Sequence, residues 1–507
     1  MSRVVCFSYE RMFYPDDKLS GPGYRLWAIA TSLTKKGHKV SIAELSHAKD
    51  YLKEGISFIS WDSIRLKDIQ KEFDVAIVPL SAYVWKYFYK IRRIPTLVDL
   101  TTPIAVESMA HSIGDSSDFF MHDGVIPTYL ALSEGDYFVC SNEMQKHFYT
   151  GMLAMLGINT IKNNLIAVAP YAPEKKKPEA EKRKVLESAV GKDRKIMLWL
   201  GSLFSWYDYK TLIRAMKDIS KAEPAACLVF AGGLNPHIRE LTQNNYDEAV
   251  SEAKKLGLLG KNIFFIDWIS PEDRLCAYEE AMFTVVTSYN TTESQLSYRT
   301  RVVDSLNSRV PVLCTDNDDL SKLISSKKMG AVIPVGDAES LIREALFLMK
   351  DRKTIERCSR NIEKEIQVGF NIEETIRPIH EFCSKPEKRT AEGCLDFREA
   401  IPAMKAKITD LEYIRDDKLA TNETLARELA KYDQRFSQVL EDKVRSEEDL
   451  RAQIASLRDE LSKQAEANLK MREFAGRFRG SIVFPMYRLT STIGKTGFGR
   501  FFQKILK

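Results

Sequence analysis

The sequence has 507 residues, of which 44% are hydrophobic and 29% are charged, and its formal net charge is +5. This length allows two or three domains, and this hydrophobic content excludes a wholly disordered chain. The eight cysteines follow no CxxC spacing, which favours reduced, buried thiols over a disulfide framework or a zinc site.

The sequence contains no segment that is typical of membrane insertion or export. No stretch reaches the ~18 consecutive apolar residues that a membrane span requires. The apolar run near the N-terminus is short and is followed by charged residues, unlike a signal peptide. We therefore expect a cytoplasmic protein.

Residues 1–172 alternate between apolar runs and helical periodicity, which predicts an α/β domain. Val4–Ser8 is the first expected strand, and Gly21-Pro22-Gly23 is expected in the loop after it. Tyr24–Lys36 has the periodicity of a helix, and Lys39–Ala43 begins the next strand. The further strands expected in this domain are Val75–Pro79, Thr96–Leu100, Tyr137–Cys140 and Leu165–Val168.

A second α/β domain is predicted over residues 194–383, after a charged, proline-flanked linker at 173–193. Apolar runs over 195–315 are each followed by a loop and a helical pattern, which is typical of βα units around a parallel sheet. Asn371–Cys383 has helical spacing and ends this domain, and 384–402 is interpreted as a polar connector.

Residues 403–471 contain neither proline nor glycine, and apolar residues recur there at steps of three and four. This heptad pattern predicts a coiled coil that joins copies of the protein or binds an assembly partner. The pattern is imperfect, because Lys443 and Ser446 fall on the seam and the step from Leu450 to Ile454 breaks the register. The alternative is a long amphipathic helix that packs on the body of the same protein.

Residues 472–507 carry eight basic residues and one acidic residue, Glu473, among many aromatic and aliphatic side chains. A basic amphipathic segment of this kind favours the surface of an anionic membrane. One alternative is that its apolar face docks on the protein body. Nucleic-acid binding is not expected, since no recognised module accompanies the segment.

One motif carries a family resemblance. Gly201 and Leu203, and then Leu212-Ile213 and Ala215, stand at the spacings of a glycine loop that leads into a helix. This block resembles the nucleotide-sugar half of GT-B glycosyltransferases of the retaining family 4 type. The resemblance implies two Rossmann-like lobes with a cleft between them. It also implies sugar transfer with retention at the anomeric carbon, without a metal ion or another cofactor.

The sequence departs from the family pattern at the positions that usually supply two cations to the donor diphosphate. Ser202 stands at the usual arginine position, Tyr207 at the usual lysine position and Asp208 at the usual second glycine. The resemblance still assigns Gly201, Ser202 and Tyr207 to the donor site. The missing positive charge has to come from other residues.

A second motif precedes the turn at Pro311. Asp304, seven residues earlier, stands where family members have a glutamate that binds the donor ribose. The position of a further family glutamate falls on Leu296, with Glu293 nearby. The resemblance therefore implies donor-binding roles for Glu293, Ser297 and Asp304.

Two arginines lie between these positions. Arg299 and Arg301 are two residues apart, just before a predicted helix, and a guanidinium group can bind a pyrophosphate bidentately. We hypothesise that one of them replaces the missing cations, and both are catalytic candidates for this reason. The alternative is that they are ordinary surface or aspartate-paired arginines.

Further donor-site candidates lie on both lobes. Gly21 and Gly23 match the glycine loop that approaches the donor phosphates from the first lobe. Gly232-Gly233 closes a strand near the donor, although a plain tight turn is equally consistent with these residues. Trp268 can stack on the nucleotide base, and its alternative is a place in the core.

The acceptor-side candidates are Asp99 and Glu107, in the segment DLTTPIAVE. Asp99 is expected to orient the acceptor hydroxyl or to accept its proton. His111 and His122 follow in the chain and are interpreted as surface histidines. The segment Ser141-Asn142-Glu143 resembles a family loop near the cleft.

Together these features predict a glycosyltransferase that moves a sugar from a UDP-, GDP- or dTDP-sugar to a glycan or lipid-linked glycan. We expect it at the inner face of the cytoplasmic membrane, in O-antigen or capsule assembly. One alternative is a nucleotide-sugar epimerase or hydrolase on the same fold. Another is a scaffold with a degenerate GT-B body, which acts through its coiled coil and tail.

Overall fold

The computed structural model divides the chain into two compact units, Met1–Ala391 and Glu392–Lys507. In the second unit it describes only residues 430–435, which are helical, and residue 437, so that the predicted coiled coil and basic tail otherwise lie outside the described residues. The described residues of the first unit are 1–13, 19–44, 50–61, 69–81, 84, 93–111, 120–172, 183–369 and 371–389.

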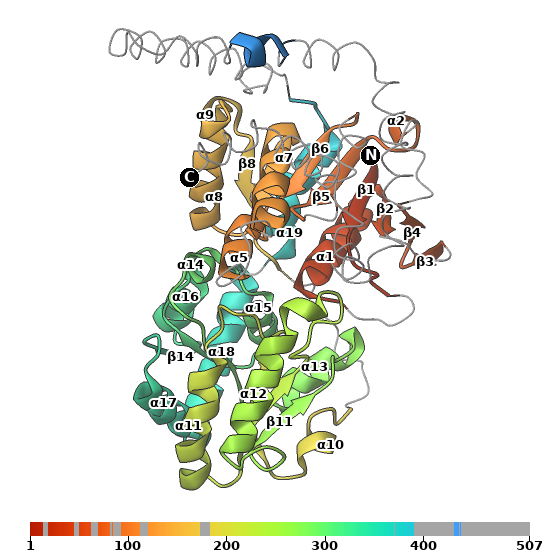
Figure 1. Ribbon diagram of the computed structural model, residues 1–507. Coiled ribbons are helices and arrows are strands. Elements are labelled where there is room, and N and C mark those ends of the chain that lie inside the picture. The colour runs from red at the N-terminus through yellow and green to blue at the C-terminus, as the bar shows by residue number, and fades with distance from the viewer. Residues whose placement is uncertain are drawn as a thin grey trace, which may run out of the picture. The chain divides into compact units, whose positions relative to one another are not determined.

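The first lobe is built on an eight-stranded sheet in the order β3-β4-β2-β1-β5-β6-β7-β8 (Figure 1). All neighbouring strands are parallel except β3 and β4. The inner strands are continuous apolar runs because both faces of the sheet are covered. The strands are β1 (Arg3–Ser8), β2 (Lys39–Glu44), β3 (Tyr51–Lys53), β4 (Ile56–Ser60), β5 (Val75–Pro79), β6 (Thr96–Asp99), β7 (Tyr137–Cys140) and β8 (Ile166–Val168).

The predicted strands of this lobe are confirmed, but the expected loop at Gly21-Pro22-Gly23 is wrong. These residues form the first turn of helix α1, because proline fits the start of a helix, where its missing N–H would have no partner anyway. The helices of the lobe are α1 (Gly21–Lys35), α2 (Ile69–Glu72), α5 (Ile104–His111), the π-helical η1 (Phe120–Val125), α7 (Ile126–Glu134), α8 (Glu143–Met155) and α9 (Thr160–Asn163).

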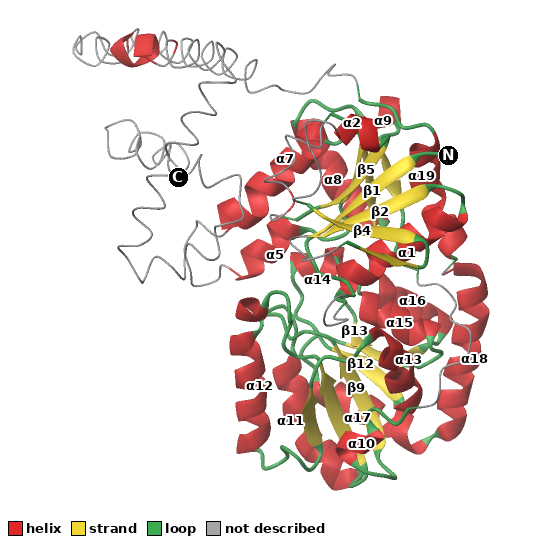
Figure 2. Ribbon diagram, turned by 90° about the vertical axis from the view of Figure 1, so that its right-hand side faces the viewer, coloured by secondary structure: helices red, strands yellow, loops and turns green. Residues whose placement is uncertain are grey.

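The second lobe has a six-stranded sheet in the order β11-β10-β9-β12-β13-β14, and all of its strands are parallel. Figure 2 shows the two sheets as separate groups of strands, each flanked by helices. The strand order reverses between β9 and β12, and ligands of such sheets bind beyond the carboxyl ends of the strands at that point. The strands are β9 (Lys195–Leu200), β10 (Ala226–Ala231), β11 (Ile263–Ile266), β12 (Phe283–Val286), β13 (Val312–Thr315) and β14 (Gly330–Ile333).

The helices of the second lobe begin within the predicted linker. Backbone N–H groups of Val185, Leu186 and Glu187 donate to the carboxylate of Glu280, so the linker is shorter than expected at this end. The helices are α10 (Glu187–Val190), α11 (Tyr209–Ala222), the 3-10 helix η2 (Arg239–Leu241), α12 (Gln243–Lys255), α13 (Pro271–Glu280), α14 (Thr292–Leu296), α15 (Thr300–Asn307), α16 (Asp319–Lys327), α17 (Ala338–Lys350) and α18 (Arg352–Gly369).

The chain then returns to the first lobe through helix α19 (Ile372–Ser384). Ile376, Ile379 and Cys383 belong to the hydrophobic core of the first lobe, and α19 packs against α1 and β7. Ser2 donates from Oγ to the carbonyl of Cys383 at 2.6 Å. Residues from both ends of the described unit therefore complete one core.

Two sequence expectations about the chain as a whole can be compared with the structure. Within the part of the chain that is described, no helix combines the length and the apolar character needed to cross a membrane. Seven of the eight cysteines are described, and all seven are buried and free. Burial raises the pKa of Cys6 and Cys140 to about 12, so these thiols stay protonated and unreactive.

Candidate active site

The loops after β9 and β12 meet at the point where the strand order of the second sheet reverses. Tyr207 and Ser288 form an isolated β-bridge between these loops, and the N–H of Asp208 donates to the carbonyl of Thr287. Gly201 has a φ of 112°, in the left-handed region that favours glycine. The predicted donor loop therefore lies at the carboxyl end of the sheet.

Arg301 lies directly on this glycine. A Cβ at Gly201 would come within 2.9 Å of Nη2 of Arg301, and this nitrogen donates to the carbonyl of Ser202 at 3.1 Å. The guanidinium also packs on the rings of Trp199 and Tyr207, at 5.2 and 4.6 Å from their centres. Its Nη1 is buried and has no hydrogen-bond partner in the described part of the chain, so Arg301 keeps a donor for a ligand.

Arg299 is held differently. Nη1 donates to the hydroxyl of Tyr207 at 2.8 Å, Nη2 lies 3.3 Å from Oε2 of Glu293, and Nε lies 3.8 Å from Oδ2 of Asp318. Burial alone would lower the pKa of Arg299, but the charge of Glu293 and its other partners raise it above its usual value. The carboxylate-paired alternative therefore describes Arg299. Nε of Arg299 and Nη1 of Arg301 are both buried without a hydrogen-bond partner among the described residues, but of the two arginines only Arg299 is ion-paired with carboxylates among those residues.

Two carboxyl groups from different lobes approach each other near this arginine. Helix α5 of the first lobe packs against α14 of the second, as Figure 1 shows, and brings Glu107 toward Glu293. Burial raises the pKa of Glu107 to about 8, with the charge of Glu293 adding to the shift and that of Arg299 opposing it. Glu107 is therefore mostly protonated at neutral pH and can donate a hydrogen bond.

Glu293 lies on α14, three residues before Leu296, the residue at the family's glutamate position. Its carboxylate accepts from Oγ of Ser297 at 2.5 Å, so the predicted Ser297 supports Glu293. The carbonyl of Leu296 accepts from Nε2 of Gln145 at 2.9 Å and from Nδ2 of Asn142 at 3.4 Å. The expected loop around Asn142 therefore contacts the second lobe directly.

The carboxylate of Asp99 is already bound within the first lobe. Its Oδ2 accepts from Nε of Arg25 at 2.6 Å, and its Oδ1 accepts from N and Oγ1 of Thr101. Both carboxylate oxygens of Asp99 therefore already accept hydrogen bonds within the first lobe, and the contact with Nε fixes the orientation of Arg25.

Asp304 joins the two lobes. Its Oδ1 accepts from the hydroxyl of Tyr171 at 2.8 Å, and its Oδ2 accepts from Nη2 of Arg274 at 2.5 Å. The Arg274 guanidinium also lies 4.6 Å from the ring centre of Tyr24 on α1. Both oxygens of Asp304 are therefore engaged by protein groups, which differs from the predicted binding of a donor ribose.

The predicted glycines face different surroundings. A Cβ at Gly21 would lie 2.8 Å from Oγ1 of Thr300, so the start of α1 meets the start of α15. A Cβ at Gly23 would lie 2.5 Å from Oε2 of Glu10, a buried carboxylate. Gly21 therefore lies where the two lobes meet, whereas Gly23 leaves room for the side chain of Glu10.

The remaining donor-site candidates, Gly232, Gly233 and Trp268, follow strands β10 and β11. Gly232 has a φ of 71°, and a Cβ there would lie 2.9 Å from the ring of Trp268. Trp268 is half-buried, and among the described residues it stands outside the two hydrophobic clusters of its lobe. A Cβ at Gly233 would instead meet the ring of Tyr246.

The structure also brings in residues that the sequence reasoning missed. Arg25 was detectable, because it lies four residues before Ile29 on the buried face of its helix, where a charged side chain is unusual. Gln145, Tyr171 and Arg274 gave no local signal, since their partners lie far along the chain. In the described part of the chain, no group of His, Cys, Asp or Glu side chains is arranged to hold a metal ion.

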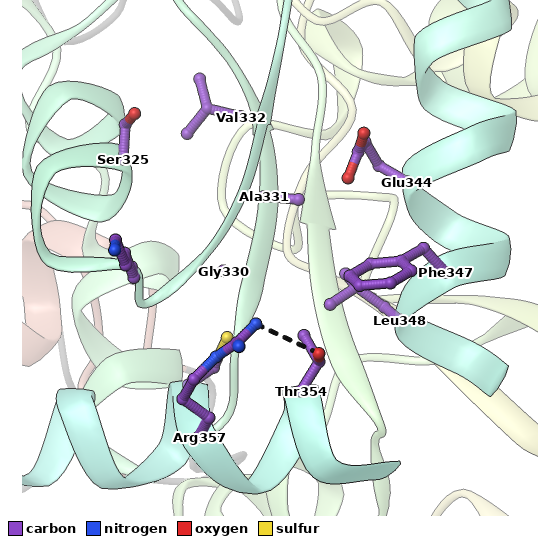
Figure 3. A pocket seen from close by; sticks show the side chains of 11 residues that line it. Ser325, Gly330, Ala331, Val332, Glu344, Phe347, Leu348, Thr354 and Arg357 are labelled. Carbon is purple, nitrogen blue, oxygen red and sulfur yellow. Dashed lines mark hydrogen bonds between the residues drawn. The ribbon is translucent and has the colours of Figure 1, made fainter. Parts of the chain in front are cut away.

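One cavity of about 190 Å³ lies elsewhere, between β14, α17 and α18 (Figure 3). Its lining includes Gly330 at the start of β14, Phe347, and Arg357, which donates to Thr354 at 3.2 Å. Because the lining begins at the amino end of β14, the cavity is not where an open parallel sheet binds its ligand.

Comparison with known proteins agrees with this architecture. Residues 180–365 match the family model described as glycosyl transferases group 1. No curated protein sequence matches the chain. Sucrose-phosphate synthase from Thermosynechococcus elongatus has a similar structure, with 14% identity and a TM-score of 0.59, over 76% of this chain and 99% of that one.

Two further solved structures are similar at 13% identity. WaaG, a glycosyltransferase involved in lipopolysaccharide biosynthesis, has a TM-score of 0.55 over 75% of this chain and 100% of its own. HepE from Anabaena, in complex with UDP-glucose, has a TM-score of 0.57 over 76% and 100%. At this identity the likeness shows the fold, and the family model adds the reaction class. The chain is a retaining glycosyltransferase of the GT-B fold, and residues 180–365 in its second lobe match the model of the glycosyl transferases group 1 family.

Proposed function

We propose that this enzyme transfers a sugar from a nucleotide sugar to a glycan or lipid-linked glycan during the assembly of a cell-surface polysaccharide. The likeness to WaaG supports the acceptor class, and the UDP-glucose complex of HepE makes UDP-glucose the first donor to test. The meeting of two helix N-termini, one from each lobe, at Gly21 and Thr300 carries the proposal.

These two helix ends suit the diphosphate of the donor. Helix N-termini carry partial positive charge and unpaired N–H groups, and they bind phosphate. Neither the α1 N-cap, Ser20, nor the α15 N-cap, Arg299, caps its helix through a side-chain hydrogen bond. Arg301 is the second residue of α15, and its unpartnered Nη1 adds a full positive charge to the same end.

The nucleotide base and the sugar then have candidate partners on either side. The base would stack on Trp268, which is half-buried against Gly232. The sugar would lie toward Glu107 and Glu293, where protonated Glu107 donates a hydrogen bond and Glu293 accepts one. Family members bind the ribose at the position of Asp304, and we assign that residue instead to joining the lobes.

The chemistry follows from charge that develops on the leaving diphosphate. Donors that are already oriented stabilise this charge without reorganising during the reaction. Helix N-terminal N–H groups and Arg301 would do so here. Contacts such as Tyr171–Asp304 and Gln145–Leu296 keep the lobes together around the reactants. A closed cleft excludes water and so disfavours loss of the sugar by hydrolysis.

The C-terminal quarter is assigned from its sequence pattern. We propose that residues 403–471 form a coiled coil between copies of the enzyme or with an assembly partner, and that 472–507 bind the inner face of the cytoplasmic membrane. Co-sedimentation with phosphatidylglycerol vesicles tests the tail, with phosphatidylcholine vesicles as control. Binding that is equal with a chain ending at residue 471 would contradict this assignment.

The donor assignment is tested by a thermal-shift screen of UDP, GDP and dTDP and their sugars. A ligand that binds the native state raises the melting temperature. We expect one nucleoside diphosphate to raise it, and its sugar to be turned over only slowly until a glycan acceptor is added. Rapid turnover of the donor alone would favour an epimerase or a hydrolase. No shift with any nucleotide would contradict donor binding.

A further inference from the structure

Arg25 has hydrogen-bonding capacity that the enzyme itself does not use. The residue is 3% exposed, and its Nε donates to Asp99 at 2.6 Å. Its Nη1 and Nη2 are buried and have no hydrogen-bond partner among the residues that the structure describes. Burying unpaired N–H groups is unfavourable, and most buried polar groups in proteins have a partner. Two unpaired nitrogens on one buried guanidinium point to a ligand.

The surroundings of Arg25 form a built site rather than an accident of packing. Asp99 is held by Thr101, whose carbonyl in turn accepts from Nε2 of Gln145 at 2.9 Å. The guanidinium is therefore fixed through a carboxylate that is itself fixed. A chain of this kind gives a binding group a defined orientation, which ligand recognition requires.

The position of Arg25 is at the carboxyl edge of the first sheet. Asp99 ends β6, and Cys140 ends β7. The charge of Arg25 opposes the rise that burial causes in the pKa of Cys140. The same charge reaches Tyr298 of the second lobe, where it opposes the rise that burial causes in the pKa of the hydroxyl. Arg25 thus lies where the strand ends of the first lobe meet the second lobe, as expected for a ligand group.

The chemistry of the ligand follows from the geometry of the free nitrogens. Two terminal nitrogens of one guanidinium match the two oxygens of a carboxylate or a phosphate, and such pairs are stronger than bonds to neutral oxygens. Gly21 and Arg25 are four residues apart and share a face of α1. Arg25 therefore lies one helical turn deeper in the first lobe than the proposed donor diphosphate.

We propose that Arg25, oriented by Asp99, binds an anionic group of the acceptor, either a phosphate ester or the carboxylate of an acidic sugar. The inference rests on the proposed function and adds that the acceptor is charged. It also gives Asp99 a positioning role on the acceptor side. Without such a ligand, two buried nitrogens of Arg25 would stay unpaired throughout the reaction.

The experiment measures the melting temperature of the full-length protein with inorganic phosphate or glucuronate, against chloride at equal ionic strength. Saturating nucleoside diphosphate, whichever of UDP, GDP or dTDP binds, keeps these anions out of the donor site. We expect phosphate or glucuronate to raise the melting temperature of the wild type. The anion with the larger effect distinguishes a phosphorylated from a carboxylate acceptor.

Three variants test the assignment. Arg25→Gln should lose the anion-dependent shift, and Arg25→Lys should keep part of it. Because Arg25→Gln leaves Asp99 unpaired, the double variant R25Q/D99N removes both charges together and should also lose the shift. Arg352→Gln, an exposed arginine on α18, is the matched control and should respond like the wild type.

The outcomes separate this inference from the proposed function. An equal anion effect in the wild type and in R25Q/D99N, or no effect in either, would overturn the inference and leave donor binding intact. A tenfold loss of nucleoside diphosphate affinity in Arg25→Gln would show that Arg25 serves the donor phosphates, and would also overturn it. No nucleoside diphosphate binding by the wild type would contradict the proposed function itself.

Discussion

The hydroxyl of Tyr171 donates a 2.8 Å hydrogen bond to Oδ1 of Asp304, across 133 positions of the sequence. Tyr171 follows the last strand of the first lobe, and Asp304 lies on α15 of the second. The other carboxylate oxygen accepts from Arg274, which packs on Tyr24 of the first lobe. Asp304 therefore links the helix that carries Arg301 to the opposite lobe.

This link predicts the effect of Tyr171→Phe. The variant keeps the buried ring and removes the hydrogen bond to Asp304. We expect a loss of roughly 1 kcal/mol in stability and a melting temperature lower by about 2–4 °C. Tyr209→Phe is the control, since its hydroxyl bonds to Glu248 within the second lobe. An unchanged melting temperature in Tyr171→Phe would show that the hydrogen bond contributes no net stability.

Arg299→Gln should affect stability first. It removes the cation paired with Glu293 and Asp318 and leaves their buried carboxylates unbalanced. Breaking a buried ion pair from one side costs about 3 kcal/mol or more, which corresponds to roughly 6–12 °C in melting temperature. Thermal unfolding measures this, with exposed Arg352→Gln as control. A variant as stable as the wild type would mean that Arg299 is not needed to balance these carboxylates.

Arg301→Gln should affect ligand binding instead. Its guanidinium makes one hydrogen bond to the protein, to Ser202, and keeps Nη1 for a ligand. Loss of a hydrogen bond to a charged phosphate corresponds to roughly 1.5–3 kcal/mol, or on the order of tenfold to a hundredfold in affinity. Calorimetric titration with the nucleoside diphosphate measures it. An affinity equal to that of the wild type would remove Arg301 from the donor site.

The raised pKa of Glu107 predicts that the stability of the protein decreases as the pH rises. Its pKa is raised to about 8, above the usual value of 4.5, so the folded state binds more protons than the unfolded state between these values. Stability from this group therefore falls as the pH rises from about 4.5 to 8. Glu107→Gln removes this titrating group. The melting temperature of the variant, relative to that of the wild type, should therefore increase from pH 5 to pH 9.

Exposed Glu356→Gln on α18 controls for the loss of a carboxylate in this comparison. The wild type and Glu107→Gln are compared at each pH, so that changes in the rest of the protein cancel. A difference in melting temperature that stays constant from pH 5 to pH 9 would contradict a raised pKa of Glu107. It would also remove the argument that this carboxyl donates a hydrogen bond at neutral pH.

His111 predicts a dependence of the opposite sign in acid. Burial lowers its pKa to about 4, from 6.5, and its ring lies 5.1 Å from that of Trp206 of the second lobe. The unfolded state binds the proton first, so stability is lost as the pH falls from about 6.5 to 4. His111→Phe should lose less melting temperature over this range than the wild type. His147→Asn, at an exposed position of α8, is the control.

Much of the fold was predictable because its signals are local. Alternating apolar runs and helical periods marked the two α/β lobes, and the helical spacing of Asn371–Cys383 marked the returning helix. The glycine loop at Gly201 was found from its spacing to the helix that follows. Two strands, β3 and β4, gave too short a pattern and were missed.

The site was only partly predictable. The sequence assigned Gly21, Gly201 and Arg301 to one predicted site, and in the structure Gly21 meets Thr300 while Gly201 meets Arg301. It could not separate Arg299 from Arg301, which stand two residues apart in the same motif. Their difference depends on Tyr207 and Asp318, which contact Arg299 only after the sheet has formed.

The sequence by itself determined most of the elements and their alternation, since periodicity is a property of neighbouring residues, and its resemblance to a family implied the class of reaction. The tertiary structure alone decided which charged side chains are paired within the protein and which keep unpaired groups for a ligand. Asp304 is bound by Tyr171, Arg299 by Glu293, and Arg25 keeps two buried nitrogens unpaired. These outcomes depend on packing between distant segments and between lobes, where burial makes each unpaired polar group energetically unfavourable.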